Sequence, residues 1–387
     1  MKSVILAGSP GKEISLLTRF TPKFGLSLLG KMLVEYSIEP LSKITRDIIL
    51  VVAQGTQEYY SRHLGKYMDK VNLTIVEQRG SGINNALKTA SPYIEDSEDT
   101  MVVYGDIISD YSLFEELIDE YTRISASLLA TTVPLGTGLE TYGNVYLDTV
   151  TQRISLIEEK PRVHTGKTSF VLGGVFIGKW RTFEEMSRYE DIISYLNNLA
   201  DKGEIYAHIW TGSWVDINYP WDMLEAVKML LDKEKESRIS RSAKISNTAV
   251  IEGIVIIEDE AKIDHYAVIK GPVYIGKNAF VGAHTLIREY SSIEADAVVG
   301  ARSELKRSII MNGAFVSSNA YLADSIVGEK ATIQPNVTTL SVYKGELAPR
   351  LKDITYRVRK IKKLGSVIGA GCILKAGEVL PAGSLVE

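Results

Sequence analysis

Cysteine is almost absent from this chain of 387 residues, which has only Cys372. A single cysteine excludes an internal disulfide and fits a reducing compartment. The sequence also lacks any apolar run near the ~20 residues of a membrane-spanning helix, and its first residues do not have the form of a signal peptide. We therefore expect a cytoplasmic protein that does not bind a membrane.

An excess of positive charge is also missing, because 44 Lys and Arg face 48 Asp and Glu, for a net charge of −4. A nucleic-acid-binding protein would normally show a basic excess, so nucleic acid is not an expected partner. Low-complexity polar tracts are absent, and 45% of the residues are hydrophobic. This composition is globular, and the length fits two domains.

The first 236 residues alternate strand-like and helix-like segments. β-Branched runs occur at 4–7, 48–52, 73–76 and 101–104, and helical patterns lie at 32–44, 56–69, 82–90, after Asp110 as N-cap, and at 220–236. Between about 126 and 180 strands dominate, which indicates a mixed-sheet extension. Alternating strands and helices predict an α/β, Rossmann-like domain over residues 1–236.

The remaining residues, 237–387, have a period of six. The aliphatic positions are Ile239, Ile245, Ile251, Ile257, Ile263, Ile269, Ile275, Val281, Ile287, Ile293, Val299, Leu305 and Met311. Such hexapeptide repeats are the signature of a parallel β-helix, in which three units close one coil and the aliphatic side chain points inward. The regular hexads stop after about 316, with one further pair at Val327 and Ile333, and return near 367. The gap holds a basic segment, 344–363, which we interpret as a solvated excursion.

The first strand runs into a loop rich in Gly, Ser and Pro, in the stretch ILAGSPGKEISLLTRFTPK of residues 5–23. Backbone N–H groups of such a loop can hold phosphate oxygens. Glu13, however, places a negative charge where a phosphate site favours a positive one. Lys12 or Arg19 could supply that charge, or Glu13 could point outward.

This stretch resembles the opening signature LAAGxGTRLxPLTxxxPK of the sugar-1-phosphate nucleotidylyltransferases that carry a left-handed β-helix. Further motifs follow in the family's order: Glu77-Gln78-Arg79-Gly80-Ser81-Gly82, Tyr104-Gly105-Asp106, Tyr142-Gly143-Asn144-Val145, Glu159-Lys160-Pro161, Leu172-Gly173-Gly174 and Trp214-Val215-Asp216-Ile217. The resemblance implies an α/β nucleotidyltransferase domain followed by a left-handed β-helix. It also implies that a nucleoside triphosphate and a sugar-1-phosphate are the substrates and Mg²⁺ is the cofactor.

The resemblance also assigns roles to individual residues. Lys23, Asp106 and Lys160 are implied to be catalytic, and Asp106 with Asp216 is implied to hold the metal. Substrate binding is implied for Gly8, Gly11, Gln78, Gly82, Gly143, Glu159 and Gly174. Leu172 replaces the family's asparagine, so one sugar contact is missing.

Two alternatives remain open at the level of sequence. Glu13, Ser318 and Leu172 fit a catalytically impaired regulatory or structural paralogue, which could assemble with an active one. A third, weaker hypothesis is acyl transfer on the β-helix. Lys363 matches the acetyltransferase members of the family, but Ser318 stands where they carry a histidine, so the general base is missing.

His265 and His284 lie in hexad turns and are expected to be exposed. Flat β-helix faces favour a homo-oligomer.

Overall fold

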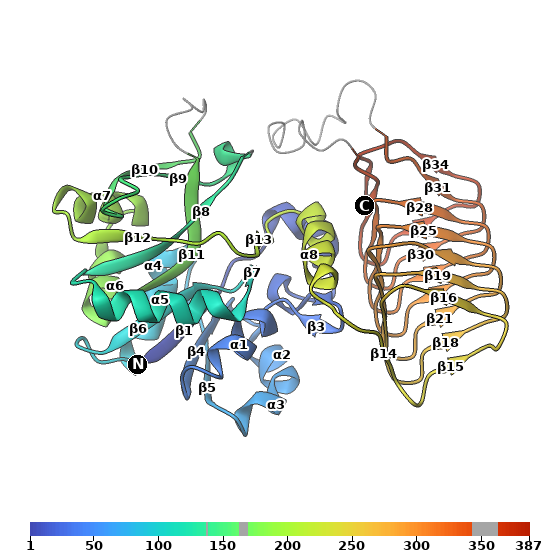
Figure 1. Cartoon of the computed structure of the whole chain (residues 1–387), viewed down its shortest axis with the longest axis horizontal. Coiled ribbons are helices and arrows are strands. Elements are labelled where there is room, and N and C mark those ends of the chain that lie inside the picture. The colour runs from blue at the N-terminus through green and yellow to red at the C-terminus, as the bar shows by residue number, and fades with distance from the viewer. Residues whose placement is uncertain (137, 162–168, 343–362) are drawn as a thin grey trace. The chain divides into compact units, whose positions relative to one another are not determined.

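The computed structural model describes residues 1–136, 138–161, 169–342 and 363–387. The basic excursion predicted at 344–363 lies, except for Lys363, outside the described residues. The chain divides into two compact units. The first contains Met1–Pro10 and Leu33–Asp216, and the second contains Gly11–Met32 and Ile217–Glu387 (Figure 1). The boundary predicted at 236/237 follows the change in sequence period and stays a prediction.

The first unit is built on a mixed sheet with the order β10-β9-β11-β6-β1-β4-β5, in which β8 pairs with β11 and β12 with β8. The strands are β1 Lys2–Ala7, β4 Asp47–Val52, β5 Asn72–Glu77, β6 Asp99–Tyr104, β8 Leu128–Pro134, β9 Gly143–Leu147, β10 Ile154–Glu159, β11 Phe170–Lys179 and β12 Ile205–Ile209. β1, β4, β5 and β6 are parallel, and β11 runs antiparallel to β6, β8 and β9. The predicted strands and the mixed extension are therefore confirmed.

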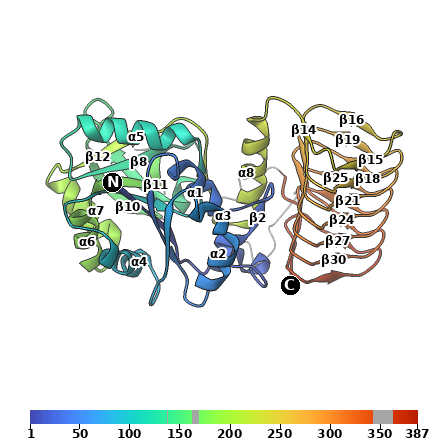
Figure 2. The same cartoon turned by 90° about the horizontal axis from the view of Figure 1, so that it is seen from below.

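Helices cover both faces of this sheet. They are α1 Glu35–Leu41, α2 Gln57–His63, α3 Gly65–Met68, α4 Ile83–Ala90, α5 Tyr111–Arg123, α6 Trp180–Arg188 and α7 Ile192–Asp201. In Figure 2, α5 lies on one side of the sheet and α4 and α6 lie on the other. Apolar residues at helical spacing explain this packing. In α5 they are Leu113, Phe114 and Leu117, all buried, and in α4 they are Ala86, Leu87 and Ala90.

Two helix predictions need correction. The pattern at 56–69 forms two short helices, α2 and α3, separated by Leu64. Asp110 occupies the N-cap position of α5, but its side chain makes no capping bond. Its Oδ2 instead accepts a hydrogen bond from the backbone N–H of Ser213, at 2.9 Å. A contact distant in sequence therefore takes the carboxylate that local reasoning assigned to the helix.

The second unit contains a parallel β-helix of three sheets, whose strands pair with those of the next coil. One sheet contains β14 Arg238–Ile239, β17 Val255–Ile257, β20 Val273–Ile275, β23 Ser291–Ile293, β26 Ile309–Ile310, β29 Ile326–Val327, β32 Val367–Ile368 and β35 Leu385–Val386. Another contains β15 Lys244–Ile245, β18 Lys262–Ile263, β21 Phe280–Val281, β24 Val298–Val299, β27 Phe315–Val316, β30 Thr332–Ile333 and β33 Ile373–Leu374. The last contains β16 Val250–Glu252, β19 Val268–Lys270, β22 Leu286–Ile287, β25 Glu304–Lys306, β28 Tyr321–Ala323, β31 Thr338–Thr339 and β34 Val379–Leu380.

The same unit also contains α8 and the segment 11–32. α8, Pro220–Asp232, begins at Pro220 as predicted and ends four residues earlier than expected. The segment 11–32 forms two 3₁₀ turns and a short hairpin: η1 Lys12–Leu17, η2 Lys23–Gly25, β2 Ser27–Leu28 and β3 Lys31–Met32. Among the described residues, no helix has both the length and the hydropathy required to cross a membrane.

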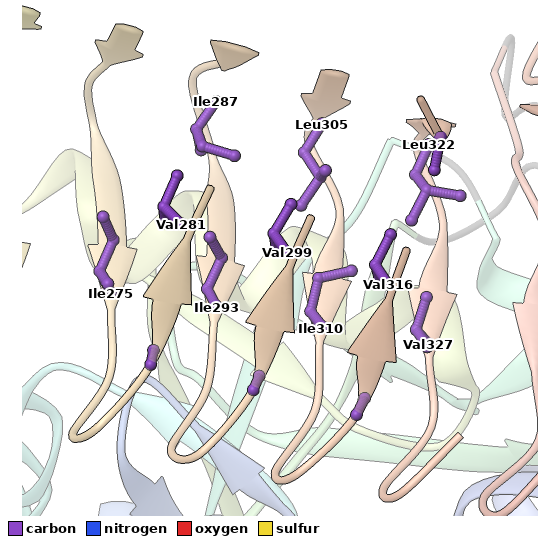
Figure 3. Close-up of a cluster of buried hydrophobic side chains, with 14 of the residues drawn as sticks. Ile275, Val281, Ile287, Ile293, Val299, Leu305, Ile310, Val316, Leu322 and Val327 are labelled. Atoms are coloured by element: carbon purple, nitrogen blue, oxygen red, sulfur yellow. The ribbon is translucent and has the colours of Figure 1, made fainter. Parts of the chain in front are cut away.

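The interior of the β-helix is a stack of aliphatic side chains (Figure 3). The sequence pattern fails at Met311, because the inward position after Leu305 is Ile310, only five residues on. Ile293 accordingly pairs with Ile310, seventeen residues away, whereas Ile275 pairs with Ile293 at the usual eighteen. Regular coils also continue through Leu322, and the pair Val327 and Ile333 belongs to the same inward stack.

Two neighbouring valines test this core. Val299 is fully buried in the stack, whereas Val298 on the same strand points outward and is partly exposed. Val299→Ala should lower the free energy of unfolding by about 1–3 kcal/mol, because it leaves a cavity that stacked coils cannot close. Urea denaturation followed by circular dichroism measures this change. Val298→Ala is the matched control, with an expected loss below about 0.5 kcal/mol, and equal losses would contradict the assignment of the inward face.

Candidate active site

Carboxylates gather at the carboxyl end of β6 in the first unit. Asp106 follows β6 after one glycine, and β7 (Ile107–Ser109) begins at the next residue. β7 pairs with β13 (Trp214–Asp216) in an antiparallel register that sets Asp216 opposite Ile107. Residues 110 positions apart in the chain are thereby brought together at the sheet edge where open α/β folds bind ligands.

Tyr104 marks the centre of this cluster. Burial raises the pKa of its hydroxyl above the usual range, and the negative charges of Glu159, Asp106 and Asp216 raise it further. Three carboxylates from three different strand ends therefore act on one hydroxyl. Asp106, Asp216 and Glu159 all act on Tyr104, a residue that sequence reasoning quoted but to which it assigned no role.

The donor set at this point suits a hard divalent cation. Asp106 and Asp216 offer carboxylate oxygens, and such ions bind a few carboxylates together with phosphate oxygens and water. Within the ranges 1–136, 138–161, 169–342 and 363–387, no group of three or more His, Cys, Asp or Glu side chains could hold a metal alone. Two carboxylates that leave ligand positions for a substrate's phosphates fit a substrate-bridging metal.

Two glycines pack closely against residues of this cluster. A Cβ at Gly143 would lie 3.2 Å from both Glu159 Oε2 and Leu172 Cδ1. Gly174 has a φ of +74°, which favours glycine, and a Cβ there would lie 3.1 Å from a ring atom of Tyr104. The pairing register of β11 shifts here, between Leu172 and Phe176. Gly143 therefore allows the backbone to pack closely against Glu159 and Leu172, and Gly174 allows the same against Tyr104.

Trp214 is a further residue of this region that sequence reasoning quoted without a role. Its Nε1–H donates to the carbonyl of Gly173, at 2.9 Å, and its ring lies 5.7 Å from that of Tyr142. It fixes the irregular part of β11 beside Gly174. In the sequence, the signal for this contact was that the aromatic residues Trp214 and Tyr142 lie close to Asp216 and Gly143.

Lys160 directly follows β10 and has an unusual backbone. Its φ is +41°, and its N–H donates to the carbonyl of Tyr142 at 3.1 Å. Its ammonium lies 3.8 Å from Glu159 Oε1, and both side chains are more than half exposed. The backbone is fixed while the charged end stays accessible, as a phosphate-binding lysine requires.

Gln78 organises a second part of the first unit. Its side chain is buried, and its Nε2 donates to the carbonyl of Gly82 at 2.9 Å. A Cβ at Gly8 would lie only 2.0 Å from Gln78 Oε1, so a side chain there would displace the Gln78 amide. Gly82 has a φ of +89° and precedes α4. Gly8, Gln78 and Gly82 thus form one contact group at the ends of β1 and β5.

Lys23 and Gly11 lie in the second unit. Lys23 is only 4% exposed, and Gly11 has a φ of +68°. A lysine is seldom fully buried unless it is paired. A Cβ at Gly11 would lie 3.0 Å from Lys23 Cβ, so the two residues are in close contact. The positive charge of Lys23 also acts to lower the pKa of Asp222, a residue to which sequence reasoning gave no role.

Asp222 is a buried carboxyl near the start of α8. It accepts hydrogen bonds from the N–H groups of Asn218 and Tyr219, at 2.9 and 2.7 Å. Burial raises its pKa to about 7, although these two bonds and the charge of Lys23 act in the opposite direction. The motif Pro220-Trp221-Asp222 was visible in the sequence, but its proximity to Lys23 was not.

The residues that raised doubt are on the surface. Glu13, Lys12 and Arg19 are all exposed, and Glu13 lies in the 3₁₀ turn η1. Glu13 is therefore not buried against the segment that carries Lys23. In the β-helix, Ser318 is partly exposed, and His265 and His284 are exposed in turns as predicted.

Known proteins similar to this chain identify its family. The family model described as "Nucleotidyl transferase" matches residues 2–233, and the model of the "GMPPB C-terminal domain" matches residues 269–375. The bifunctional protein GlmU of Methanocaldococcus jannaschii is 30% identical over 380 residues, which cover 95% of this chain and 88% of that protein. A bifunctional sugar-1-phosphate nucleotidylyltransferase/acetyltransferase of Sulfurisphaera tokodaii is 26% identical, with coverage of 95% and 90%.

A solved structure has the same fold over part of the chain. It is a Bacillus anthracis protein described as a glucose-1-phosphate thymidylyltransferase, in complex with a sucrose, with a TM-score of 0.53 and 20% identity. It covers 62% of this chain and 97% of its own. This chain belongs to the sugar-1-phosphate nucleotidyltransferase family of transferases, with a Rossmann-like domain followed by a left-handed β-helix. Enzymes of this family generally use a divalent metal ion.

The raised pKa of Asp222 predicts a pH dependence of stability. Because the folded state binds this proton more tightly than the unfolded state, the group's contribution to stability falls as the pH rises from about 4 to about 7. Asp222→Asn keeps an oxygen acceptor for the two N–H groups and removes the ionisation. It should flatten this part of the profile by a few kcal/mol, measured by urea denaturation between pH 4.5 and 8.

The control for this experiment is Glu236→Gln, which neutralises an exposed carboxylate just after the same helix. Its profile should match that of the unmodified protein. A profile for Asp222→Asn that is as steep as that of the unmodified protein would show that Asp222 is already ionised at pH 5.

Proposed function

We propose that the cluster around Tyr104 binds a sugar-1-phosphate and Mg²⁺, and that the chain transfers a nucleotidyl group to that sugar phosphate. A phosphate oxygen of the sugar-1-phosphate attacks the α-phosphorus of a nucleoside triphosphate. The bond from that phosphorus to the bridging oxygen of the β-phosphate breaks, and pyrophosphate leaves. The observation that carries this proposal is the pairing of β7 with β13, which sets Asp216 opposite Ile107 and thus next to Asp106, while Glu159 acts on the same Tyr104 hydroxyl.

Asp106 and Asp216 would hold the Mg²⁺ ion, which when bound neutralises charge on the phosphates. The protein's own groups do the rest by alignment and electrostatics, since this chemistry needs little covalent help. Glu159, which lies against Gly143, accepts hydrogen bonds from sugar hydroxyls. Lys160 pairs with the sugar's phosphate from its exposed position.

The nucleotide is assigned to the other two contact groups. Gln78 holds the loop of Gly82 in place beside Gly8, which leaves backbone groups of that loop to bind the base. Lys23, with Gly11, is assigned to the triphosphate, where its charge offsets that of the leaving pyrophosphate.

The single cysteine supports a reducing, cytoplasmic location.

A regulatory paralogue remains the second candidate because of Glu13 and Leu172. The exposure of Glu13 favours activity over that alternative, because an exposed carboxylate is screened by water and salt. Acyl transfer is supported by the names of the relatives, whereas Ser318 offers a hydroxyl in place of an imidazole and therefore no general base near neutral pH.

A second copy of the chain is the proposed partner of one β-helix face. The outward side chains Phe280, Val298, Phe315, Thr332 and Ile373 pair in succession along the sheet of β21 to β33. Phe315 and Ile373 are 44% and 67% exposed. A continuous apolar strip of this kind is typical of an interface.

Asp106→Asn tests the metal assignment. It should lower the rate of pyrophosphate release by about 10²–10³-fold, since an amide binds a cation far more weakly than a carboxylate. The assay uses Mg²⁺, each of ATP, GTP, UTP and dTTP, and several sugar-1-phosphates, with EDTA as a further arm. The control, Asp148→Asn, changes an exposed turn aspartate and should retain the full rate. No release by the unmodified protein with any pair would refute the proposed function.

Glu13→Arg tests whether loop charge limits the rate. At about 4 Å, unit charges interact by about 4 kcal/mol at an effective dielectric near 20, but screening at this exposed site reduces the effect. We expect kcat/KM to rise up to about tenfold, with Glu13→Gln at an intermediate value. An unchanged rate would show that Lys12 or Arg19 already supplies the charge or that another position is limiting.

Phe315→Glu combined with Ile373→Glu tests the apolar strip. The double variant should convert an oligomer to monomers in size-exclusion chromatography with light scattering, because each buried carboxylate would lack a partner. Lys244→Glu with Lys262→Glu, on the same sheet outside the strip, is the control. A monomeric unmodified protein, or an oligomer that survives the double variant, would contradict the proposal.

A further inference from the structure

The segment 11–32, which carries most of the phosphate-loop signature, is packed within the same compact unit as the β-helix. Chain contacts group it with residues 217–387, whereas Met1–Pro10 belongs to the α/β unit. The polypeptide therefore leaves the first unit at Gly11 and returns to it at Leu33. Two glutamates of the β-helix hold the segment in this course.

Glu294 is the first of them. It lies in the turn after β23 and is fully buried. Its Oε1 accepts from the N–H of Leu29 at 2.8 Å, and its Oε2 accepts from the N–H of Gly30 at 2.9 Å and the hydroxyl of Ser27 at 2.8 Å. The hydroxyl of Ser292 donates to Oε1 at 2.5 Å. Three of the four donors that bind this buried carboxylate come from the segment.

The turn that Glu294 binds has an uncommon backbone conformation. Leu29 and Gly30 both have positive φ, +48° and +76°, and such a conformation is uncommon for leucine. A Cβ at Gly30 would lie 2.2 Å from the hydroxyl oxygen of Tyr274, another β-helix residue. The turn between β2 and β3 is therefore shaped against the β-helix and is held there by the carboxylate.

Glu329 is the second. Its Oε2 accepts from the hydroxyl of Thr21 at 2.6 Å. Close by, the N–H of Ala370 donates to the carbonyl of Leu16 at 2.8 Å, and the ammonium of Lys330 lies 4.8 Å from the ring centroid of Phe20. Residues 16–21 are thus bound to the β-helix independently of residues 27–30.

Lys23 lies between these two attachments in the chain. It is two residues from Thr21 and four from Ser27, in the turn η2, with its buried side chain against Gly11. Two fixed points so close along the chain leave the lysine little conformational freedom. Preorganised charge is worth more than mobile charge in phosphate chemistry.

We propose that Glu294 and Glu329 are positioning residues that make the β-helix part of the triphosphate-binding machinery. This inference rests on the proposed function, because it assigns Lys23 to the triphosphate. Neither glutamate touches the substrate. Each acts by holding the segment that carries Lys23.

Glu294→Gln is the sharpest test, because the amide keeps the shape but places an NH₂ group against donors. Thr21→Val is the second variant, since it removes the hydroxyl that Glu329 binds at nearly constant volume. Glu304→Gln is the control, because Glu304 is a β-helix glutamate that pairs with Arg288, outside the segment. Melting temperature and circular dichroism verify folding of the full-length variants.

The kinetic readout separates positioning from general stability. In pyrophosphate release, we expect Glu294→Gln to raise the KM for the triphosphate about tenfold and Thr21→Val to raise it about threefold, with the KM for the sugar-1-phosphate within twofold. Glu304→Gln should change neither. Equal changes in both KM values, or none in variants that remain folded, would overturn the proposal.

Two readouts do not depend on turnover, so failure of the proposed function can be distinguished from failure of this inference. Hydrogen exchange of residues 11–32 should accelerate at least tenfold in Glu294→Gln, while exchange of β20 and β26 stays unchanged. The Kd of each of ATP, GTP, UTP and dTTP with Mg²⁺, measured by calorimetry, should rise for any that bind. Unchanged exchange in the segment would refute the positioning role whether or not the unmodified protein turns over.

Discussion

Each coil of the β-helix can bury its inward aliphatic side chain only beneath the next coil, and the rest of the second unit depends on this constraint. It fixes the stack from Ile257 to Leu374. A rigid stack in turn gives its outer turns fixed positions. Glu294 and Glu329 occupy such turns, and their carboxylates determine the course of the signature segment. The β-helix thereby holds the segment that carries Lys23, the residue that we assign to the triphosphate.

In the α/β unit, the main constraint is the repulsion between the carboxylates of Asp106, Asp216 and Glu159. Burial raises the pKa of Tyr104, and the negative charges of Glu159, Asp106 and Asp216 raise it further. These three carboxylates lie at or next to the ends of β10, β6 and β13, so the strand ends fix their positions. A divalent cation would offset the repulsion between such carboxylates.

Sequence reasoning succeeded where physics is local or periodic. The alternation of β-branched runs and helical patterns predicted the strands β1, β4, β5 and β6, and the hexads predicted the β-helix. It failed where one residue altered the count. A coil of seventeen residues moved the inward position from Met311 to Ile310, because pairing with Ile293 and not sequence spacing selects the side chain that faces inward. Asp110 likewise matched a local N-cap rule, but a bond to Ser213 prevailed.

The sequence by itself determined the family, the two kinds of period and the residue types of the candidate site, because motifs and periods are properties of order along a chain. Tertiary structure alone decided the neighbours. It placed Asp222 beside Lys23, Tyr104 among three carboxylates and Glu294 against a turn 265 residues away. It also placed Glu13, whose negative charge is unfavourable in a phosphate-binding loop, at the surface. Hydrogen bonds and desolvation depend on distance in space, which a linear sequence does not specify.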